Sequence, residues 1–117
     1  MEKIFTFTGA RKIVFGRGAL QQLPDLIREL QAHRPLIVLD RQLATTGLKE
    51  RVAELLKKGG LEARLFDQVD PEPKLALADE GAKLAVKAKC DLVVGIGGGS
   101  AMDVAKAVAV VAGNKGR

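Results

Sequence analysis

The sequence has little of what builds disulfides, metal sites and aromatic binding surfaces. Its 117 residues include one cysteine, Cys90, and one histidine, His33. These counts exclude a disulfide within the chain and any multi-cysteine or multi-histidine metal site. Tryptophan and tyrosine are absent and phenylalanine occurs four times, so the stacking surfaces of single-stranded nucleic-acid binders are nearly missing. We expect Cys90 to be a small core residue and His33 a surface imidazole, with no Ser-His-Asp set.

Long apolar runs are also missing. No stretch of about 18 apolar residues occurs, so we expect no membrane span. The first residues, MEKIFTFTGARK, mix acidic and basic side chains and lack the apolar segment of a secretory signal. The sequence therefore predicts a protein of the reducing cytoplasm.

Positive charge is in moderate excess. The net charge is +5, with 47% hydrophobic and 28% charged residues, which is typical of one globular domain at most. The excess lies in residues 1–60 and is dispersed. Solvated helix faces explain it, and attraction to an anionic ligand stays open. Duplex nucleic acid has the least support, because no basic stripe or known motif occurs.

Strand and helix patterns alternate along the chain. Residues 3–15, KIFTFTGARKIVF, predict a two-stranded hairpin with a turn at 8–10. Short apolar runs predict strands at 36–39, 63–66 and 92–96, and apolar stripes predict helices at 19–32, from 48 to the Gly59-Gly60 stop, at 75–89 and at 101–112. This alternation predicts an α/β fold, with a parallel sheet covered by helices on both faces after an N-terminal β-hairpin.

The predicted helix at 101–112 is apolar on nearly all sides, which is typical of a buried helix. The sequence stops shortly after it, at 113–117. We therefore expect an incomplete domain, from a truncated chain or the N-terminal piece of a longer enzyme. An uncovered apolar helix and an open sheet edge are compatible with self-association as a homo-oligomer.

A glycine-rich turn, Gly97-Gly98-Gly99-Ser100, joins the predicted strand at 92–96 to the last helix. A helix N-terminus offers free N–H groups and partial positive charge, and glycines let the backbone approach a pyrophosphate closely. Neither common phosphate-binding fingerprint is present, since G-x-G-x-x-G begun at Gly95 would need glycine at position 100. A tight strand-to-helix connection therefore stays open beside phosphate binding.

Polar residues near this turn have two readings each. Ser100 and Asp103 match an S-x-x-D capping box, and Ser100 could also face a phosphate. Lys106 lies three residues after Asp103, which fits an ion pair or a ligand contact. Asp40, at the end of the strand at 36–39, either caps a loop or accepts from the ribose hydroxyls of NAD. Its charge disfavours the 2′-phosphate of NADP, whereas Arg41 favours it.

The segment Gly97-Gly98-Gly99-Ser100-Ala101-Met102-Asp103-Val104-Ala105-Lys106-Ala107 resembles the signature of the iron-containing (group III) alcohol dehydrogenases, in their N-terminal half. The resemblance runs along the whole chain. It includes Phe5, Phe7, 13–16 and Gly18, then 36–40 with Gly47, then Pro71 and Pro73, then 91–96. Glu72 departs from the pattern, because many relatives have asparagine there, near the cofactor.

The resemblance implies that residues 1–117 form the N-terminal part of a Rossmann-like dinucleotide-binding domain. It places NAD, with NADP left open, against Asp40, Gly97, Gly98, Gly99, Ser100, Asp103 and Lys106. It also implies a divalent metal, iron, held by a later helical domain, and an alcohol or aldehyde substrate. No catalytic or metal-binding residue is then expected within the chain. Alternatives are a glycerol dehydrogenase-like or dehydroquinate synthase-like enzyme of the same fold, and a non-enzymatic α/β binding module.

Overall fold

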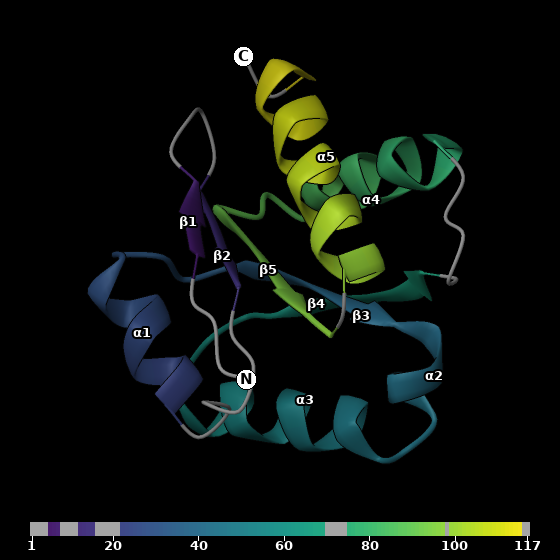
Figure 1. Cartoon of the computed structure of the whole chain (residues 1–117). Helices are drawn as coiled ribbons and strands as arrows, with labels where there is room; N and C mark the ends of the chain where they lie inside the picture. The colour runs from purple at the N-terminus through teal and green to yellow at the C-terminus, as the bar shows by residue number, and fades with distance from the viewer. Residues whose placement is uncertain (1–4, 8–11, 16–21, 70–74, 98, 116–117) are drawn as a thin grey trace.

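A computed structural model describes residues 5–7, 12–15, 22–69, 75–97 and 99–115 of the chain (Figure 1). The strands are β1 (Phe5–Phe7), β2 (Lys12–Phe15), β3 (Pro35–Asp40), β4 (Arg64–Val69) and β5 (Leu92–Ile96). The helices are α1 (Leu23–Glu29), α2 (Arg41–Ala44), α3 (Leu48–Lys58), α4 (Leu75–Lys87) and α5 (Gly99–Lys115). The predicted α/β architecture is confirmed.

One sheet holds all five strands, in the order β1-β2-β5-β3-β4. β2, β5, β3 and β4 run parallel, and β1 pairs antiparallel with β2 at one edge. The two strands of the predicted hairpin are therefore present, and its turn at 8–10 lies outside the described residues. β2 also pairs with β5, so the hairpin extends the parallel sheet directly.

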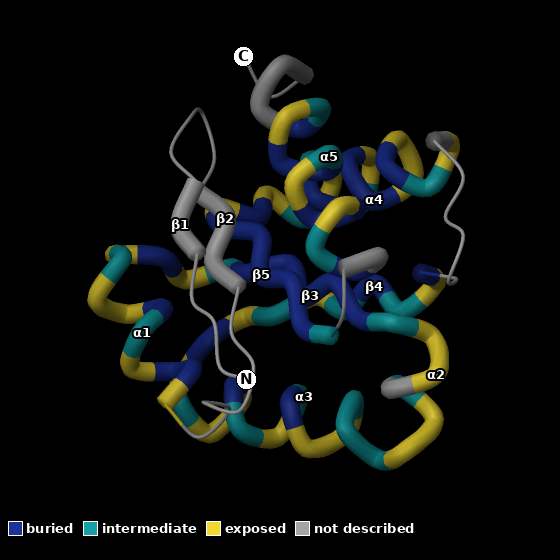
Figure 2. The backbone as a smooth tube through the Cα atoms, viewed as in Figure 1, coloured by how far each residue is buried: buried dark blue, intermediate teal, exposed yellow. Residues whose placement is uncertain are grey.

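β5 is buried along its length, and its neighbour β3 is buried except at Asp40, which is partly exposed (Figure 2). Successive side chains of a strand point to opposite faces. Leu36, Val38 and Val93 accordingly join a core beneath α4 and α5, whereas Ile37 and Val94 join a core with α1 and α3. Helices thus cover both faces, which explains why these strands have continuous apolar runs.

The ends of the helices follow local signals. Pro24 stands in the first turn of α1, where its missing N–H is not needed. This helix, Leu23–Glu29, lies within the predicted range 19–32, whose first residues, 19–21, lie outside the described part. α3 ends at Lys58, and Gly60 takes a left-handed φ of +79° while its N–H donates to the Lys57 carbonyl. The predicted Gly59-Gly60 stop is confirmed.

α5 is better covered than its apolar sequence suggested. Its small residues Ala101, Ala105 and Ala109 are buried against α4 and the sheet. Val110, 48% exposed, is the large hydrophobic residue left exposed among those whose burial is described. Close packing of small side chains explains this cover. No helix in the described part of the chain is long and apolar enough to cross a membrane.

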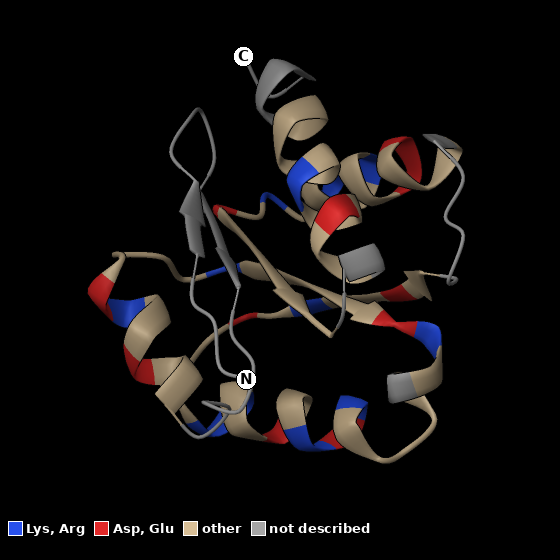
Figure 3. Ribbon diagram, viewed as in Figure 1, with Lys and Arg blue, Asp and Glu red and all other residues tan. Residues whose placement is uncertain are grey.

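Charges are interspersed over the helices (Figure 3). Arg28 pairs with Asp25 on α1, and Lys58 Nζ lies 3.0 Å from Glu54 Oε1 on α3. All four side chains are exposed, and such pairs at helical spacing contribute little to stability. On these two helices the charged residues form solvated faces, as the dispersed charge predicted.

Candidate functional site

The topological switch point of the sheet lies between β3 and β5. These neighbouring strands are parallel, but α2 and α3 follow β3 on one face whereas α5 follows β5 on the other (Figure 1). Ligands of open α/β sheets bind beyond the carboxyl ends of strands at such a point. Leu39 is paired with Ile96. The next residues, Asp40 and Gly97, therefore stand together at this edge although 57 positions apart.

Asp40 caps a short helix that sequence reasoning missed. Its Oδ1 accepts a hydrogen bond from the Gln42 backbone N–H at 2.8 Å, at the start of α2. An aspartate followed by four helix-compatible residues was the signal available in the sequence. The sequence left two roles open for Asp40, capping a loop and binding ribose, and the structure shows the capping role. Because a carboxylate accepts through both oxygens, capping through Oδ1 is compatible with a ligand at Oδ2.

The glycine turn joins β5 to α5 at the same edge. Gly97 has φ +135°, a conformation that side-chain-bearing residues rarely adopt. Gly98 lies outside the described residues. α5 begins at Gly99, so Ser100 stands inside the first helical turn and not at the N-cap position that a capping box requires. The N-terminus of this 17-residue helix therefore lies beside the ends of β3 and β5.

Asp103 and Lys106 lie further along α5, and both are exposed. At a rise of about 1.5 Å per residue they stand roughly 6 and 10 Å along the axis from Gly99. Helical side chains tilt toward the N-terminus, so both lean back toward the switch point. The structure thus groups Asp40, Gly97 and the start of α5 at one edge, with Asp103 and Lys106 one to two turns beyond it.

An ion pair near this edge carried no sequence signal. Lys49 Nζ, on α3, lies 2.7 Å from Asp67 Oδ2, on β4. The hydrogen bond from Lys49 lowers the pKa of the Asp67 carboxyl below its ordinary value, and the charge of Arg41 lowers it further. The same bond raises the pKa of Lys49. The pair joins α3 to the outer strand of the sheet.

Metal chemistry finds no support in the described part of the chain. There, no group of three or more histidine, cysteine, aspartate or glutamate side chains could hold a metal ion. Cys90 is fully buried, as expected of a core residue, and His33 is exposed. The loop with Pro71, Glu72 and Pro73 lies outside the described residues.

These features define an open, doubly wound α/β fold whose topological switch point lies between β3 and β5. The family model described as iron-containing alcohol dehydrogenase matches residues 10–117. The chain is 39% identical over 104 residues to the NAD-dependent methanol dehydrogenase of Bacillus methanolicus, covering 89% of this chain and 27% of that protein. The chain therefore belongs to the iron-containing alcohol dehydrogenase family.

Solved structures agree with this assignment. NADH-dependent butanol dehydrogenase A from Thermotoga maritima matches with a TM-score of 0.70 and 35% identity, over 89% of this chain and 26% of that one. Sulfoacetaldehyde reductase from Bifidobacterium kashiwanohense, in complex with NAD+, matches with a TM-score of 0.69 and 27% identity, over 91% and 28%. The chain spans about a quarter of the length of these relatives.

Proposed function

We propose that the chain is the cofactor-binding portion, within one dinucleotide-binding domain, of an NAD(P)-dependent, metal-dependent alcohol dehydrogenase. The whole enzyme transfers hydride between a primary or secondary alcohol and the nicotinamide. One observation carries the proposal: Asp40 and Gly97 meet at the switch point, where the N-terminus of α5 also lies. Membership of the iron-containing alcohol dehydrogenase family supports this branch over the other enzymes of the same fold.

The arrangement suits a dinucleotide whose pyrophosphate meets the turn of Gly97, Gly98, Gly99 and Ser100. Backbone N–H groups at the start of a helix and its partial positive charge favour phosphate oxygens. The φ of Gly97 requires glycine for the turn itself, and a residue without Cβ also leaves the backbone there open to a pyrophosphate.

Asp40 is proposed to accept from the adenosine ribose and to favour NAD over NADP by charge repulsion. Asp103 and Lys106 then border the nicotinamide side, since both lean toward the same edge from α5. The proposed substrate is an alcohol or aldehyde. We also propose that the protein self-associates as a homo-oligomer. A cytoplasmic setting fits a chain whose single cysteine, the buried Cys90, forms no internal disulfide.

In this proposal a divalent metal, iron, would supply Lewis-acid chemistry to the whole enzyme and would be held by residues other than those described here. The described residues do not fit such a metal, because they contain no suitable group of ligands. We therefore assign this chain cofactor binding alone.

The test is a titration of the chain into NADH, followed by the emission of the cofactor, with NADPH in parallel. The chain lacks tryptophan and tyrosine, so its own emission hardly interferes. We expect saturable binding, tighter for NADH than for NADPH. The variant Asp40→Asn keeps a side-chain oxygen for the cap of α2 but removes the charge.

In Asp40→Asn we expect the preference for NADH over NADPH to narrow about tenfold, equivalent to roughly 1.4 kcal/mol. Far-UV circular dichroism shows whether the variant is folded. An emission that does not saturate with either cofactor, or an unchanged preference in folded Asp40→Asn, contradicts the proposal.

A further inference from the structure

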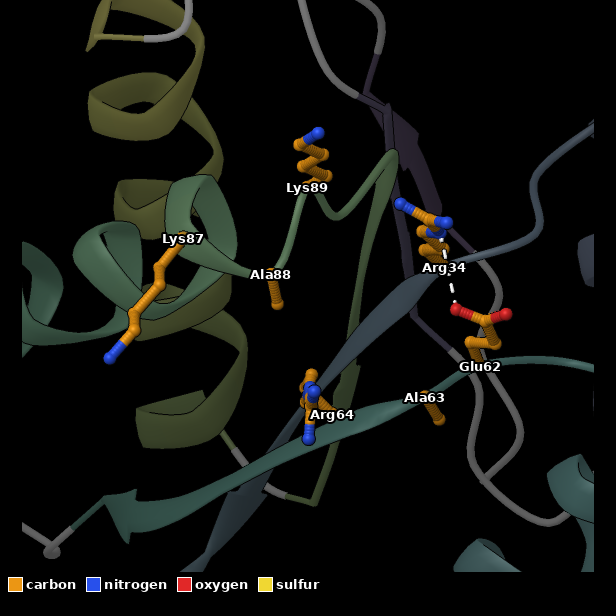
Figure 4. Close-up of a pocket in the computed structure, with 7 residues that line it drawn as sticks. All are labelled: Arg34, Glu62, Ala63, Arg64, Lys87, Ala88 and Lys89. Atoms are coloured by element: carbon orange, nitrogen blue, oxygen red, sulfur yellow. Dashed lines mark ion pairs between the residues drawn. The ribbon is translucent and has the colours of Figure 1, made fainter.

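A second concave feature lies at the opposite end of the sheet from the switch point. It is a cleft of about 530 Å³ lined by four basic residues, one glutamate and two alanines (Figure 4). Its walls come from the starts of β3 and β4 and from the loop between α4 and β5. Parallel strands begin at this end and finish at the other, so the cleft takes no part in the proposed dinucleotide site.

Two of the side chains that line the cleft are small. Ala63, just before β4, and Ala88, just after α4, both line the cleft. The strands are held together at this end by Asp91, whose carboxylate oxygens accept from the backbone N–H groups of His33 and Arg34, each at 2.9 Å. These bonds tie the segment of Arg34 to that of Lys89, and the Glu62 N–H, which donates to the His33 carbonyl at 3.0 Å, ties in the segment of Arg64.

Positive charge dominates the lining. The lining holds four cations, Arg34, Arg64, Lys87 and Lys89, and one carboxylate, Glu62, whose Oε2 lies 3.3 Å from Arg34 Nε. The Asp91 carboxylate, which accepts from backbone donors, adds a second negative charge nearby. Four cations therefore outnumber two carboxylates at this end of the sheet, and Arg34 keeps its terminal nitrogens as donors beside its ion pair.

One of the four basic side chains that line the cleft points away from the others. Figure 4 shows Lys87 extending away from Arg34 and Lys89, on the far side of Ala88. Three cations from three different segments therefore remain: Arg34 before β3, Arg64 at the start of β4, and Lys89 after α4. Three separated cations are matched better by an anion that has several charged groups than by an anion that has one.

The backbone at Lys89 is a further observation. Lys89 has φ +57° and closes α4, where its N–H donates to the Val86 carbonyl. Glycine is the usual residue in this left-handed position, and α3 uses Gly60 there. A lysine in its place is locally unfavourable but brings a cation to the cleft.

We propose that this cleft binds a small oligophosphate through Arg34, Arg64 and Lys89. Its volume falls in the range of small-molecule sites, and its charged lining selects a charged ligand. Arginine matches phosphate oxygens with two parallel N–H donors, and lysine adds a point charge. This site is independent of the proposed dinucleotide site, which lies at the other end of the same strands.

The test uses inorganic tripolyphosphate and orthophosphate as probes, titrated into the ¹⁵N-labelled chain and followed by two-dimensional NMR. Tripolyphosphate should give saturable shifts in the amides of residues 62–64 and 88–91, at lower concentration than orthophosphate. Shifts that do not saturate, or that concentrate at residues 97–101, overturn the proposal. Such shifts at 97–101 would leave the proposed dinucleotide site intact, so the two can fail separately.

Matched variants decide whether these particular cations form the site. Arg64→Gln and Lys89→Gln each remove one charge and should weaken tripolyphosphate binding about fivefold, whereas Lys87→Gln, with the same charge change, should weaken it by less than about twofold. Equal losses in Lys87→Gln and Lys89→Gln overturn the proposal, because general attraction to a basic protein then explains the binding.

Lys89→Gly separates binding from folding. It removes the cation and supplies the residue that a left-handed φ favours, so we expect a higher Tm together with weaker tripolyphosphate binding. A Lys89→Gly chain that binds tripolyphosphate as tightly as the unchanged chain overturns the role given to Lys89.

Discussion

Gly81, on α4, packs closely against Val108 of α5. A Cβ added at this position would lie 2.6 Å from Val108 Cγ2 and 3.4 Å from Phe66 Cε2. Both neighbours belong to the same buried core. The valine side chain is stiff at χ1, so it cannot simply turn aside. Gly81→Ala therefore forces α4 and α5 apart or strains the core.

Two effects of opposite sign set the expected magnitude. Alanine in a helix interior is favoured over glycine by about 1 kcal/mol. Overpacking a close-packed core costs roughly 1–3 kcal/mol, and the upper half of this range suits a methyl group placed well inside van der Waals contact. We expect Gly81→Ala to lower the free energy of unfolding by about 1–2 kcal/mol.

Urea denaturation followed by far-UV circular dichroism measures this change. The double variant Gly81→Ala/Val108→Ala is the control, because it removes the methyl group that the new Cβ meets. We expect the double variant to be more stable than the sum of the single effects by at least about 1 kcal/mol. A Gly81→Ala chain as stable as the unchanged one, or additive effects in the double variant, would refute the reasoning.

Further predictions concern the two ends of the sheet. Asp91→Ala removes the acceptor of the His33 and Arg34 N–H groups and should lower the free energy of unfolding by about 1–2 kcal/mol in urea, with a smaller loss in Asp91→Asn, which restores one acceptor. The lowered pKa of Asp67 adds stability that is present above its ordinary pKa and is lost as pH falls through the lowered one. Tm measured against pH should therefore fall less steeply in acid for Lys49→Gln, and an unchanged acid slope would contradict the ion pair as its cause. The chain alone should oxidise no alcohol with NAD and added metal, because its described residues hold no metal-binding group; NADH formation by the pure chain would disprove this.

Elements with strong local signals were predictable. The apolar run at 36–39 and that at 92–96 are strands, because residues buried on both faces leave no polar interruption. The Gly59-Gly60 stop ends α3 where expected, since a left-handed residue is needed there. The family resemblance, carried by the segment 97–107, is confirmed as well.

Features that join distant residues were not predictable. The Lys49–Asp67 pair joins residues 18 positions apart, and no local sequence pattern around either residue predicts it. The basic cleft gathers Arg34, Arg64 and Lys89, which the sequence shows only as dispersed charge. The capped turn of α2 was overlooked because four residues are too few for an apolar stripe.

Local sequence patterns were enough to predict which runs are strands, which are helices, and where glycine permits a turn. These depend on side-chain type and on interactions within a few residues. Tertiary structure alone decided the strand order β1-β2-β5-β3-β4 and the pairing of Leu39 with Ile96, which brings Asp40 beside Gly97. Strand order and register depend on how both faces of the sheet pack against helices, and this packing joins residues that are far apart in the chain.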